Sequence, residues 1–228
     1  MISPQRVIEL PGGARVLFTE RSDGNLSRVA GTDADGGAAA RERLREQIGV
    51  AALARGYQVH GTVVRIVSEP PTSAAPRPGG EQADGQATSL YGVGVMVLAA
   101  DCLPVALAGE DGVAMIHAGW RGLAAGVLEE GVRSLRRLIG AGPIHAVLGP
   151  CACACCYEVG EEVHGAFAGA HRNGRMLDMR AIARDRLLAA SVADVREVQA
   201  CTICDPRFFS HRREGARAGR QAGVAWLS

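Results

Sequence analysis

The chain has 228 residues, with 25 basic and 24 acidic side chains, and every basic residue is an arginine. Because lysine is absent, a Schiff-base lysine, a catalytic lysine base and the lysine of a Walker-type phosphate loop are all excluded. The formal net charge of +1 provides no sequence-wide basic field for binding nucleic acid or an anionic membrane.

Length and hydropathy predict one soluble domain, residues 1–228, that buries roughly 70–75% of its unfolded surface. No stretch approaches the roughly 18–20 apolar residues of a membrane span, and the N-terminal residues contain no apolar run of signal length. We therefore predict a cytoplasmic protein with no nucleic-acid, membrane or protein partner. Seven cysteines, an odd number, fit reduced thiols with a metal or catalytic site better than a secreted disulfide scaffold.

Predicted elements of the first half begin with a short strand at 15–18, after a Pro-Gly-Gly turn. The polar, glycine-rich stretch 21–37 is predicted as loop, and the composition of 37–55 predicts a helix. The β-rich run 57–67 predicts a strand with His60 in its middle, where a histidine by itself is more often structural than a ligand. A proline-rich surface loop is expected at 69–85.

Strands and helices alternate in the second half as well, so the fold class is α/β or α+β. The continuous apolar run 93–100 predicts a strand buried on both faces. Apolar residues at helical spacing predict a helix over 123–139, which ends at Gly-Ala-Gly-Pro. The other predicted elements are a hairpin of 103–108 and 113–117, a strand at 144–148, and helices at 159–170 and 179–190.

The hairpin has a geometric consequence for chemistry. A four-residue turn pairs Ala108 with Val113 and Pro104 with His117, and makes Cys102 a diagonal neighbour of His117 on the same face. Backbones of diagonal neighbours lie roughly 7–8 Å apart. Side chains at that separation can share one metal ion or form a thiolate–imidazole pair. A register shift of one residue would instead place them on opposite faces.

The segment His117-Ala-Gly-Trp-Arg-Gly leads from a strand directly into a predicted helix. Glycines permit close approach of a ligand to the backbone, and Arg121 adds a planar charged group. These features are consistent with an oxyanion or phosphate site. The alternative is a simple turn, with Trp120 as a core or rim aromatic.

Five motifs occur in the order found in one family, namely Gln58-Val-His-Gly, Ala100-Asp-Cys-Leu-Pro, His117-Ala-Gly-Trp-Arg-Gly, Cys156-Tyr-Glu-Val-Gly and Asp205-Pro-Arg-Phe-Phe-Ser-His-Arg-Arg. The chain resembles the multicopper polyphenol oxidase, or laccase-domain, family, which includes zinc-dependent purine nucleoside phosphorylases and the bacterial peptidoglycan editing factor. The resemblance implies an αββα layered sandwich, similar to the cysteine hydrolase fold of the cytotoxic necrotizing factor-type deamidases.

The same resemblance implies that His60, Cys102 and His117 bind a metal ion, with Cys102 and His117 as catalytic residues. A His2Cys set with an open fourth position is typical of catalytic zinc. The implied activity is phosphorolysis of adenosine, inosine or methylthioadenosine, together with deamination of adenosine. Arg121 would then bind the phosphate. The H-x-E…P-C-x-x-C deaminase signature is absent, so another proton shuttle would be required, with Asp101 and Glu158 as weak candidates.

Three further residues are candidates for contacts with phosphate or substrate. Asp23-Gly-Asn-Leu-Ser is a shortened counterpart of a family Asn-Leu-Gly element, which makes Asn25 a candidate. Near the C-terminus, Phe209 can stack on a base and Arg212 can bind an anion. For both of these, a core aromatic beside a solvated arginine face is an equally good interpretation.

The remaining thiols leave two alternatives open. Cys151-Ala-Cys-Ala-Cys-Cys and Cys201-Thr-Ile-Cys can together form a second, structural zinc site. Reduced thiols that merely pack near one another are the favoured interpretation, because one C-x-x-C pair is modest evidence.

Two other functions compete with the phosphorylase. A cysteine hydrolase or amidase would use Cys102 as nucleophile and His117 as base, for example in editing wrongly built peptidoglycan precursors. A copper polyphenol oxidase is less favoured than a zinc enzyme. It requires roughly ten histidine ligands, and the chain has six histidines.

Overall fold

The computed structural model describes residues 4–31, 36–71 and 80–228, and two β-sheets packed face to face dominate the described part. The first sheet has the strand order β1-β2-β13-β6-β3, and the C-terminal strand β13 lies between the N-terminal hairpin and β6. Its strands are β1 (Val7–Leu10), β2 (Ala14–Phe18), β13 (Gln221–Leu227), β6 (Val93–Ala99) and β3 (Ala52–Ala54).

The second sheet has the order β12-β9-β7-β8-β5-β4, with the β7–β8 hairpin at its centre. Its pairing confirms the predicted register, because Ala108 lies opposite Val113 and Pro104 opposite His117. The strands are β12 (Asp194–Glu197), β9 (His145–Leu148), β7 (Leu103–Gly109), β8 (Gly112–Ala118), β5 (Gly85–Thr88) and β4 (Val64–Ile66), and β10 (Arg172–Asn173) pairs separately with β11 (Met176–Leu177).

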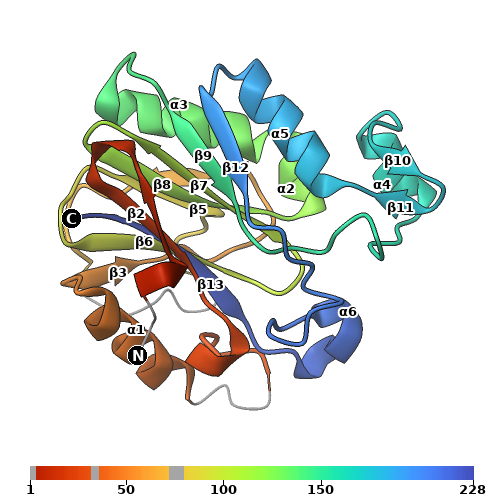
Figure 1. Ribbon diagram of the computed structural model, residues 1–228, viewed down its shortest axis with the longest axis horizontal. Coiled ribbons are helices and arrows are strands. Elements are labelled where there is room, and N and C mark those ends of the chain that lie inside the picture. The colour runs from red at the N-terminus through yellow and green to blue at the C-terminus, as the bar shows by residue number, and fades with distance from the viewer. Residues whose placement is uncertain (1–3, 32–35, 72–79) are drawn as a thin grey trace.

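Helices cover the outer face of each sheet (Figure 1). On the first sheet, α1 packs through Ala40 and Leu44 against Leu17 and Met96. On the second sheet, apolar residues of α2, α3 and α5 share a core cluster with β7 and β8. The α-helices are α1 (Gly37–Ile48), α2 (Trp120–Ala125), α3 (Val127–Ile139), α4 (Glu161–Ala166), α5 (Met179–Ala189) and α6 (His211–Glu214), and short 3-10 helices span Pro4–Arg6, Pro11–Gly13, Arg21–Asp23 and Gly215–Arg217.

A third apolar cluster fills the space between the two sheets. Val16, Val95 and Val97 of the first sheet contact Ala106 and Met115 of the second in this cluster. Strands β6, β7, β8 and β13 are buried along their whole length, because a neighbouring layer covers each face. The layer order is therefore helix, sheet, sheet, helix, which confirms the αββα expectation.

Three predicted elements differ from the structure. The helix over 123–139 is two helices, because Gly126 adopts a left-handed φ of 98° between α2 and α3. The helix over 37–55 ends at Ile48, where Gly49 with φ 72° forms the C-cap and β3 follows. In the run 57–67 only β4 is a strand, and the predicted loop 69–85 lies partly outside the described residues.

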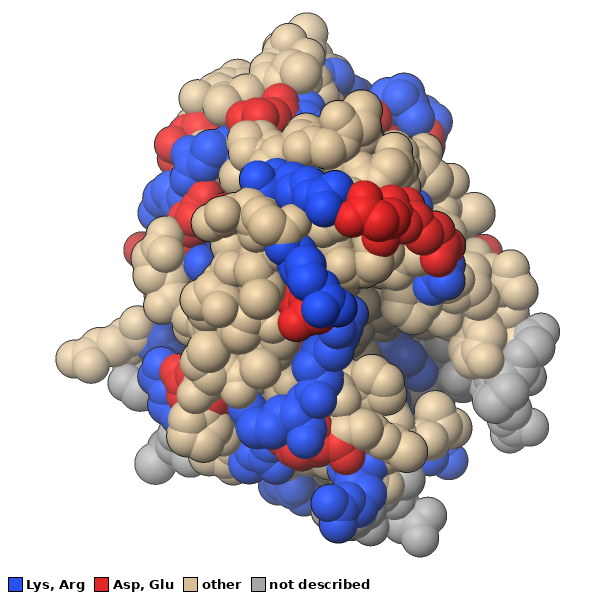
Figure 2. Space-filling model, turned by 90° about the vertical axis from the view of Figure 1, so that its right-hand side faces the viewer, with Lys and Arg blue, Asp and Glu red and all other residues tan. Residues whose placement is uncertain are grey.

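The surface mixes basic and acidic groups. On the face that Figure 2 shows, a band of arginine side chains runs beside a hollow, and acidic groups adjoin it at several points. In the described ranges, no helix has both the length and the apolar character that a bilayer-spanning segment needs.

Candidate active site

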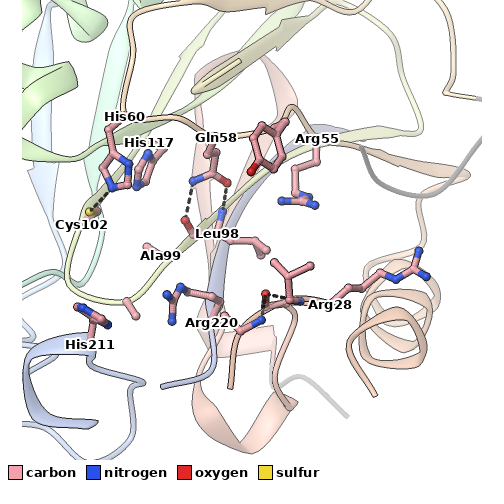
Figure 3. Close-up of a pocket in the computed structure, with 15 residues that line it drawn as sticks. Arg28, Arg55, Gln58, His60, Leu98, Ala99, Cys102, His117, His211 and Arg220 are labelled. Atoms are coloured by element: carbon pink, nitrogen blue, oxygen red, sulfur yellow. Dashed lines mark hydrogen bonds between the residues drawn. The ribbon is translucent and has the colours of Figure 1, made fainter. Parts of the chain in front are cut away.

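A cavity of about 730 Å³ contains the candidate active site. Such a volume is typical of small-molecule sites, which span ≈ 300–1,000 Å³. One end is lined by His60, Cys102 and His117. Figure 3 shows arginines around the other end, and Leu98 and Ala99 at the C-terminal end of β6 lie between the two ends. The two ends therefore differ in chemistry: one offers sulfur and imidazole ligands, and the other offers guanidinium groups.

The ligand atoms of His60, Cys102 and His117 lie within 4.8 Å of one another. Cys102 precedes β7 and His117 lies on β8, so the hairpin brings them together, and Cys102 Sγ is 3.8 Å from His60 Nε2. Zinc bonds of ≈ 2.3 Å to sulfur and ≈ 2.0–2.1 Å to nitrogen in a tetrahedron would separate these atoms by ~3.5 Å. The donor set and its spacing therefore fit a metal ion such as zinc.

His60 reaches this site from a turn and not from the middle of a strand. Its φ of 61° lies in the left-handed region, and its peptide N–H donates to Asp84 Oδ1 over 2.9 Å. The prediction of a strand at this position was wrong, because the extended pairing of the segment is limited to a single bridge at Tyr57 and to β4. A left-handed residue turns the chain so that the imidazole lies over the hairpin end.

Glycines of the His117-Ala-Gly-Trp-Arg-Gly segment have a packing role. A Cβ atom on Gly119 would lie 2.5 Å from His60 Cδ2 and 3.3 Å from Cys102 Sγ. A Cβ atom on Gly122 would lie 2.7 Å from the carbonyl oxygen of Gly61. These positions exclude any side chain, because the His60 turn packs directly on the start of α2.

Asp84 holds both histidines of this group in place, and no sequence pattern predicted that role. It is fully buried, and its Oδ1 accepts a hydrogen bond of 2.8 Å from His117 Nδ1. Its Oδ2 accepts from the N–H groups of Val59 and Gly61, at 3.0 Å and 2.8 Å. One carboxylate thus orients both histidines, as carboxylate partners of metal-bound histidines do. The local signal was only an Asp-Gly pair at the end of the predicted 69–85 loop, and that pair is common in turns.

The charges of this cluster stabilise one another. Burial raises the pKa of Cys102, but His117 and His60 outweigh that effect and lower it to about 6. Burial also lowers the pKa of His117, yet the Cys102 thiolate and Asp84 raise it to about 9. For Asp84, burial opposes ionisation, but the hydrogen bonds from His117 and Val59 hold its pKa below the ordinary value. The result is a thiolate beside an imidazolium backed by a carboxylate.

The opposite end of the cavity is lined by Arg28, Arg55 and Arg220 (Figure 3). Within residues 4–31, 36–71 and 80–228, none of the three forms an ion pair with an acidic side chain. Burial and the charge of Arg28 lower the pKa of Arg55. Next to them, Arg41 of α1 is buried, and its Nη atoms have no hydrogen-bond partner in the part of the chain that the structure describes. Burial, together with Arg55 and Arg28, lowers the pKa of Arg41 to about 10. Like charges kept together without a counterion indicate an anion site.

Three predicted substrate residues lie outside the cavity lining. Arg121 is exposed and its guanidinium stacks 4.3 Å above the Trp120 ring, while α2 is only six residues long. Phe209 is buried beneath Gly219, with Arg21 stacked 4.3 Å from its ring centroid. Arg212 is exposed and donates through Nη1 to the carbonyl oxygen of Glu158 over 2.9 Å.

Asn25 and Asp101 lie outside the cavity lining, and their hydrogen bonds hold segments that border it. Asn25 Oδ1 accepts from the N–H groups of Ser27 and Arg220, and its Nδ2 donates to the Ala30 carbonyl, so it shapes a segment that lines the cavity. Asp101 adopts φ 88°, and its carboxylate accepts from Thr202 Oγ1 at 2.6 Å. Their hydrogen bonds give both residues a positioning role.

His211 of α6 also lines the cavity. Its Nδ1 lies 3.0 Å from the carbonyl oxygen of Gly215, which can only accept, so the neutral ring carries its proton on Nδ1 and presents Nε2 as an acceptor. His211 belongs to the C-terminal arginine-rich motif, and the sequence pattern predicted no function for it. Tertiary structure brings it to the same cavity as His60 and Cys102.

Comparisons with known proteins place this chain in a family. Residues 16–228 match the family described as Multi-copper polyphenol oxidoreductase laccase. A protein of Xylella fastidiosa strain Temecula1 named purine nucleoside phosphorylase is 41% identical over 95% of this chain and 88% of its own length. A Corynebacterium glutamicum protein with the same activity in its name is 34% identical over 93% of this chain and 94% of its own length.

Solved structures agree with these matches. The crystal structure of a Neisseria meningitidis protein of the DUF152 family superposes with a TM-score of 0.83 at 31% identity, covering 97% of this chain and 98% of that one. YlmD of Geobacillus stearothermophilus shares the fold with a TM-score of 0.83 at 24% identity, covering 100% and 98%. The family match extends over most of the described residues, including both ends of the cavity. The chain belongs to the multi-copper polyphenol oxidoreductase laccase family.

Proposed function

We propose that the protein is a zinc-dependent purine nucleoside phosphorylase, which converts a purine nucleoside and phosphate into the base and ribose 1-phosphate. One observation carries the proposal: a single cavity joins three arginines, none of them ion-paired within the described residues, to the group His60, Cys102 and His117. The arginine end would bind the phosphate, since this chain has no lysine to do so. The names of the similar Xylella and Corynebacterium proteins support the same activity.

The chain's own residues supply binding and orientation for this reaction. Arg28, Arg55 and Arg220 would hold phosphate so that one oxygen attacks C1′ of the ribose while the bond from C1′ to the purine nitrogen breaks. The electron pair of that bond leaves with the base, which then takes up a proton. Zinc held by His60, Cys102 and His117 would supply a Lewis-acidic positive charge at the other end of the cavity. His211 Nε2 offers a polar contact to the substrate between them.

Deamination of adenosine would be a second reaction at the same site, and it would need a separate proton shuttle. Glu158 forms an ion pair with Arg175, and the Asp101 carboxylate is occupied by Thr202 and by the N–H group of Arg212. Both candidates are therefore held outside the cavity lining. An assay that resolves inosine from adenine separates deamination from phosphorolysis.

Phosphate recognition gives a direct test with a matched control. We expect Arg55→Ala to raise the KM for phosphate by roughly tenfold to a hundredfold, because a charged hydrogen bond contributes about 1.5–3 kcal/mol. The neighbouring cations Arg28 and Arg220 stay in place in this variant. The measurement is phosphate-dependent release of adenine or hypoxanthine from adenosine or inosine.

Arg121→Ala is the control, because this exposed arginine stacks on Trp120 outside the cavity lining. Its KM for phosphate should stay near the wild-type value. The opposite pattern, with Arg121→Ala impaired and Arg55→Ala unchanged, would move the phosphate site to the start of α2. Release of base at equal rate without phosphate would contradict phosphorolysis altogether.

A second candidate, a cysteine hydrolase or amidase, is favoured by one specific arrangement. Cys102, His117 and Asp84 stand in the order of a nucleophile, a base and an orienting carboxylate, and His117 Nδ1 is 2.8 Å from Asp84 Oδ1. The editing of wrongly built peptidoglycan precursors belongs to this class. Metal binding and nucleophilic attack are alternatives here, because one thiolate cannot serve both roles at once.

Alkylation distinguishes the two roles. We expect the Cys102 thiol of the isolated, metal-loaded protein to resist iodoacetamide and to react at least tenfold faster after a chelator has removed the metal. Mass spectrometry of the peptide that contains Cys102 measures the rate. Immediate alkylation of metal-loaded protein, unaffected by the chelator, would favour the nucleophile instead.

Zinc is preferred over copper on the chemistry of the donors. All six histidines lie within the described residues, and among them only His60 and His117 join the metal-capable group. His171 instead lies 2.6 Å from Asp185, and His164 is buried in α4. A copper oxidase needs an additional histidine-rich cluster, which these residues do not form.

A further inference from the structure

Four cysteine thiols outside the cavity lining converge at the surface. Cys155 and Cys156 belong to the turn after β9, and Cys201 and Cys204 belong to the loop after β12. Their sulfur atoms all lie within 4.8 Å of one another, although up to 49 residues separate them in the sequence. None of the four lines the cavity of the proposed phosphorylase site.

The sulfur atoms are close enough together to bind one metal ion in a tetrahedral site. Cys156 Sγ is 3.3 Å from the sulfurs of both Cys201 and Cys204, and Cys155 Sγ is 3.4 Å from Cys156 and 3.7 Å from Cys204. Four thiolates around zinc at ≈ 2.3 Å would be separated by ~3.8 Å. The contacts of Cys156 do not single out one disulfide partner, because Cys201 and Cys204 are equally close. From this geometry we propose that these four cysteines form a second, structural zinc site.

The backbone of both loops is arranged for such a site. In the first, the N–H groups of Cys156 and Tyr157 donate to the carbonyl of Cys153, which closes a turn that aims two adjacent cysteines at one point. In the second, the N–H of Asp205 donates to the carbonyl of Cys201, which closes the C-x-x-C turn. The N–H of Cys153 also donates to Cys201 Sγ over 3.4 Å, a contact that stabilises thiolate charge.

Nearby cations offset the negative charge of a tetrathiolate. Arg213 donates through Nη1 to the carbonyls of Thr202 and Ile203, inside the C-x-x-C turn. Arg180 donates to the carbonyl of Ala200, immediately before Cys201. Each thiol that binds zinc releases its proton to solvent, and the metal keeps its charge and oxidation state, so the site requires no oxidant or reductant.

The site also supports the catalytic end of the cavity. Thr202, within the C-x-x-C turn, donates to Asp101, and its N–H donates to the carbonyl of Cys151. Asp101 directly precedes Cys102, so the second zinc site fixes the loop from which this ligand projects. The convergence of four thiols from two separate loops favours this site over the alternative of reduced thiols that merely pack near one another.

Metal stoichiometry tests the proposal, on the full chain purified under reducing conditions with zinc supplied. We expect two zinc ions per wild-type chain by elemental analysis, and one in Cys155→Ser/Cys204→Ser, whose altered residues are both exposed. Cys153→Ser is the matched control in the same loop and should keep two, because its thiol contacts the Cys151 and Ala200 carbonyls. Equal zinc content in the wild type and the double variant would overturn the proposal, whereas one zinc ion in the wild type and none in the double variant would count only against the cavity metal.

Cobalt provides a second measurement in case the double variant does not fold. Cys102→Ser loses a ligand of the cavity site and keeps the four surface thiols, so added Co²⁺ reports on the surface site. A tetrahedral tetrathiolate gives intense visible d–d and sulfur-to-cobalt charge-transfer bands, which added zinc should abolish. The lack of these bands in the folded variant, or a native mass that shows a disulfide among these thiols, would refute the site.

Discussion

Cys102→Ala should lower kcat/KM for phosphorolysis at least a thousandfold and remove the metal ion from the cavity. Its sulfur is one of three ligand atoms within 4.8 Å, and two imidazoles by themselves hold zinc far more weakly. A thousandfold loss corresponds to about 4 kcal/mol of transition-state stabilisation, which is within the contribution of a Lewis-acidic metal. The measurements are steady-state cleavage of adenosine in phosphate and elemental analysis for zinc.

The same experiment separates this role from general destabilisation. Cys153→Ser changes a thiol outside the cavity and should keep both its activity and its zinc content at wild-type levels. His117→Ala should reproduce the effect of Cys102→Ala, since the imidazole belongs to the same group. Turnover within tenfold of the wild type in either variant would mean that the metal group does not take part in the reaction.

Asp84→Asn should weaken zinc binding in the cavity by about tenfold to a hundredfold, the usual effect of losing the carboxylate partner of a metal-bound histidine. Asp84 accepts from His117 Nδ1 and from three N–H groups of the His60 turn. An asparagine amide would turn its NH₂ group toward two of those donors. We also expect a loss of about 3 kcal/mol in the free energy of unfolding, because buried donors then lack acceptors.

Chelator competition measures the zinc affinity, and thermal unfolding measures the stability, with a decrease in Tm of about 6–12 °C for a chain of this size. Asp111→Asn is the matched control, because Asp111 is an exposed carboxylate in the β7–β8 turn that accepts from the Tyr91 hydroxyl. Its zinc affinity should equal that of the wild type. Equal affinity in Asp84→Asn would show that the carboxylate does not orient the ligand histidine.

Several features of the fold follow from local sequence. The apolar run at β6 is a fully buried strand, and the length of the Gly-Glu-Asp-Gly turn sets the β7–β8 register. That register alone predicts that Cys102 and His117 meet, because side chains opposite and diagonal across a hairpin are close whatever surrounds them. Local sequence also predicted α5, whose N-cap Asp178 accepts from the N–H of Ala181.

Other predictions were wrong where a single backbone angle decides the outcome. Gly126 breaks one periodic helix into α2 and α3, although the apolar spacing continues across it. His60 adopts a positive φ because three N–H groups of its turn are held by Asp84, which is 24 residues away. Periodicity reports which face of an element is apolar, and it carries no information about such a long-range constraint.

The sequence by itself determined the mixed α/β class, the meeting of Cys102 with His117, and the requirement that arginine or backbone N–H groups bind any anion, because lysine is absent. Only the tertiary structure shows which arginines lie together in one cavity. Arg28, Arg55 and Arg220 come from three separate segments, and the structure brings them to one cavity while Arg121 stays outside it. The same holds for Asp84 and for the four-cysteine group. Their partners are distant in the chain, so packing of the two sheets and their loops, and not spacing, brings them into contact.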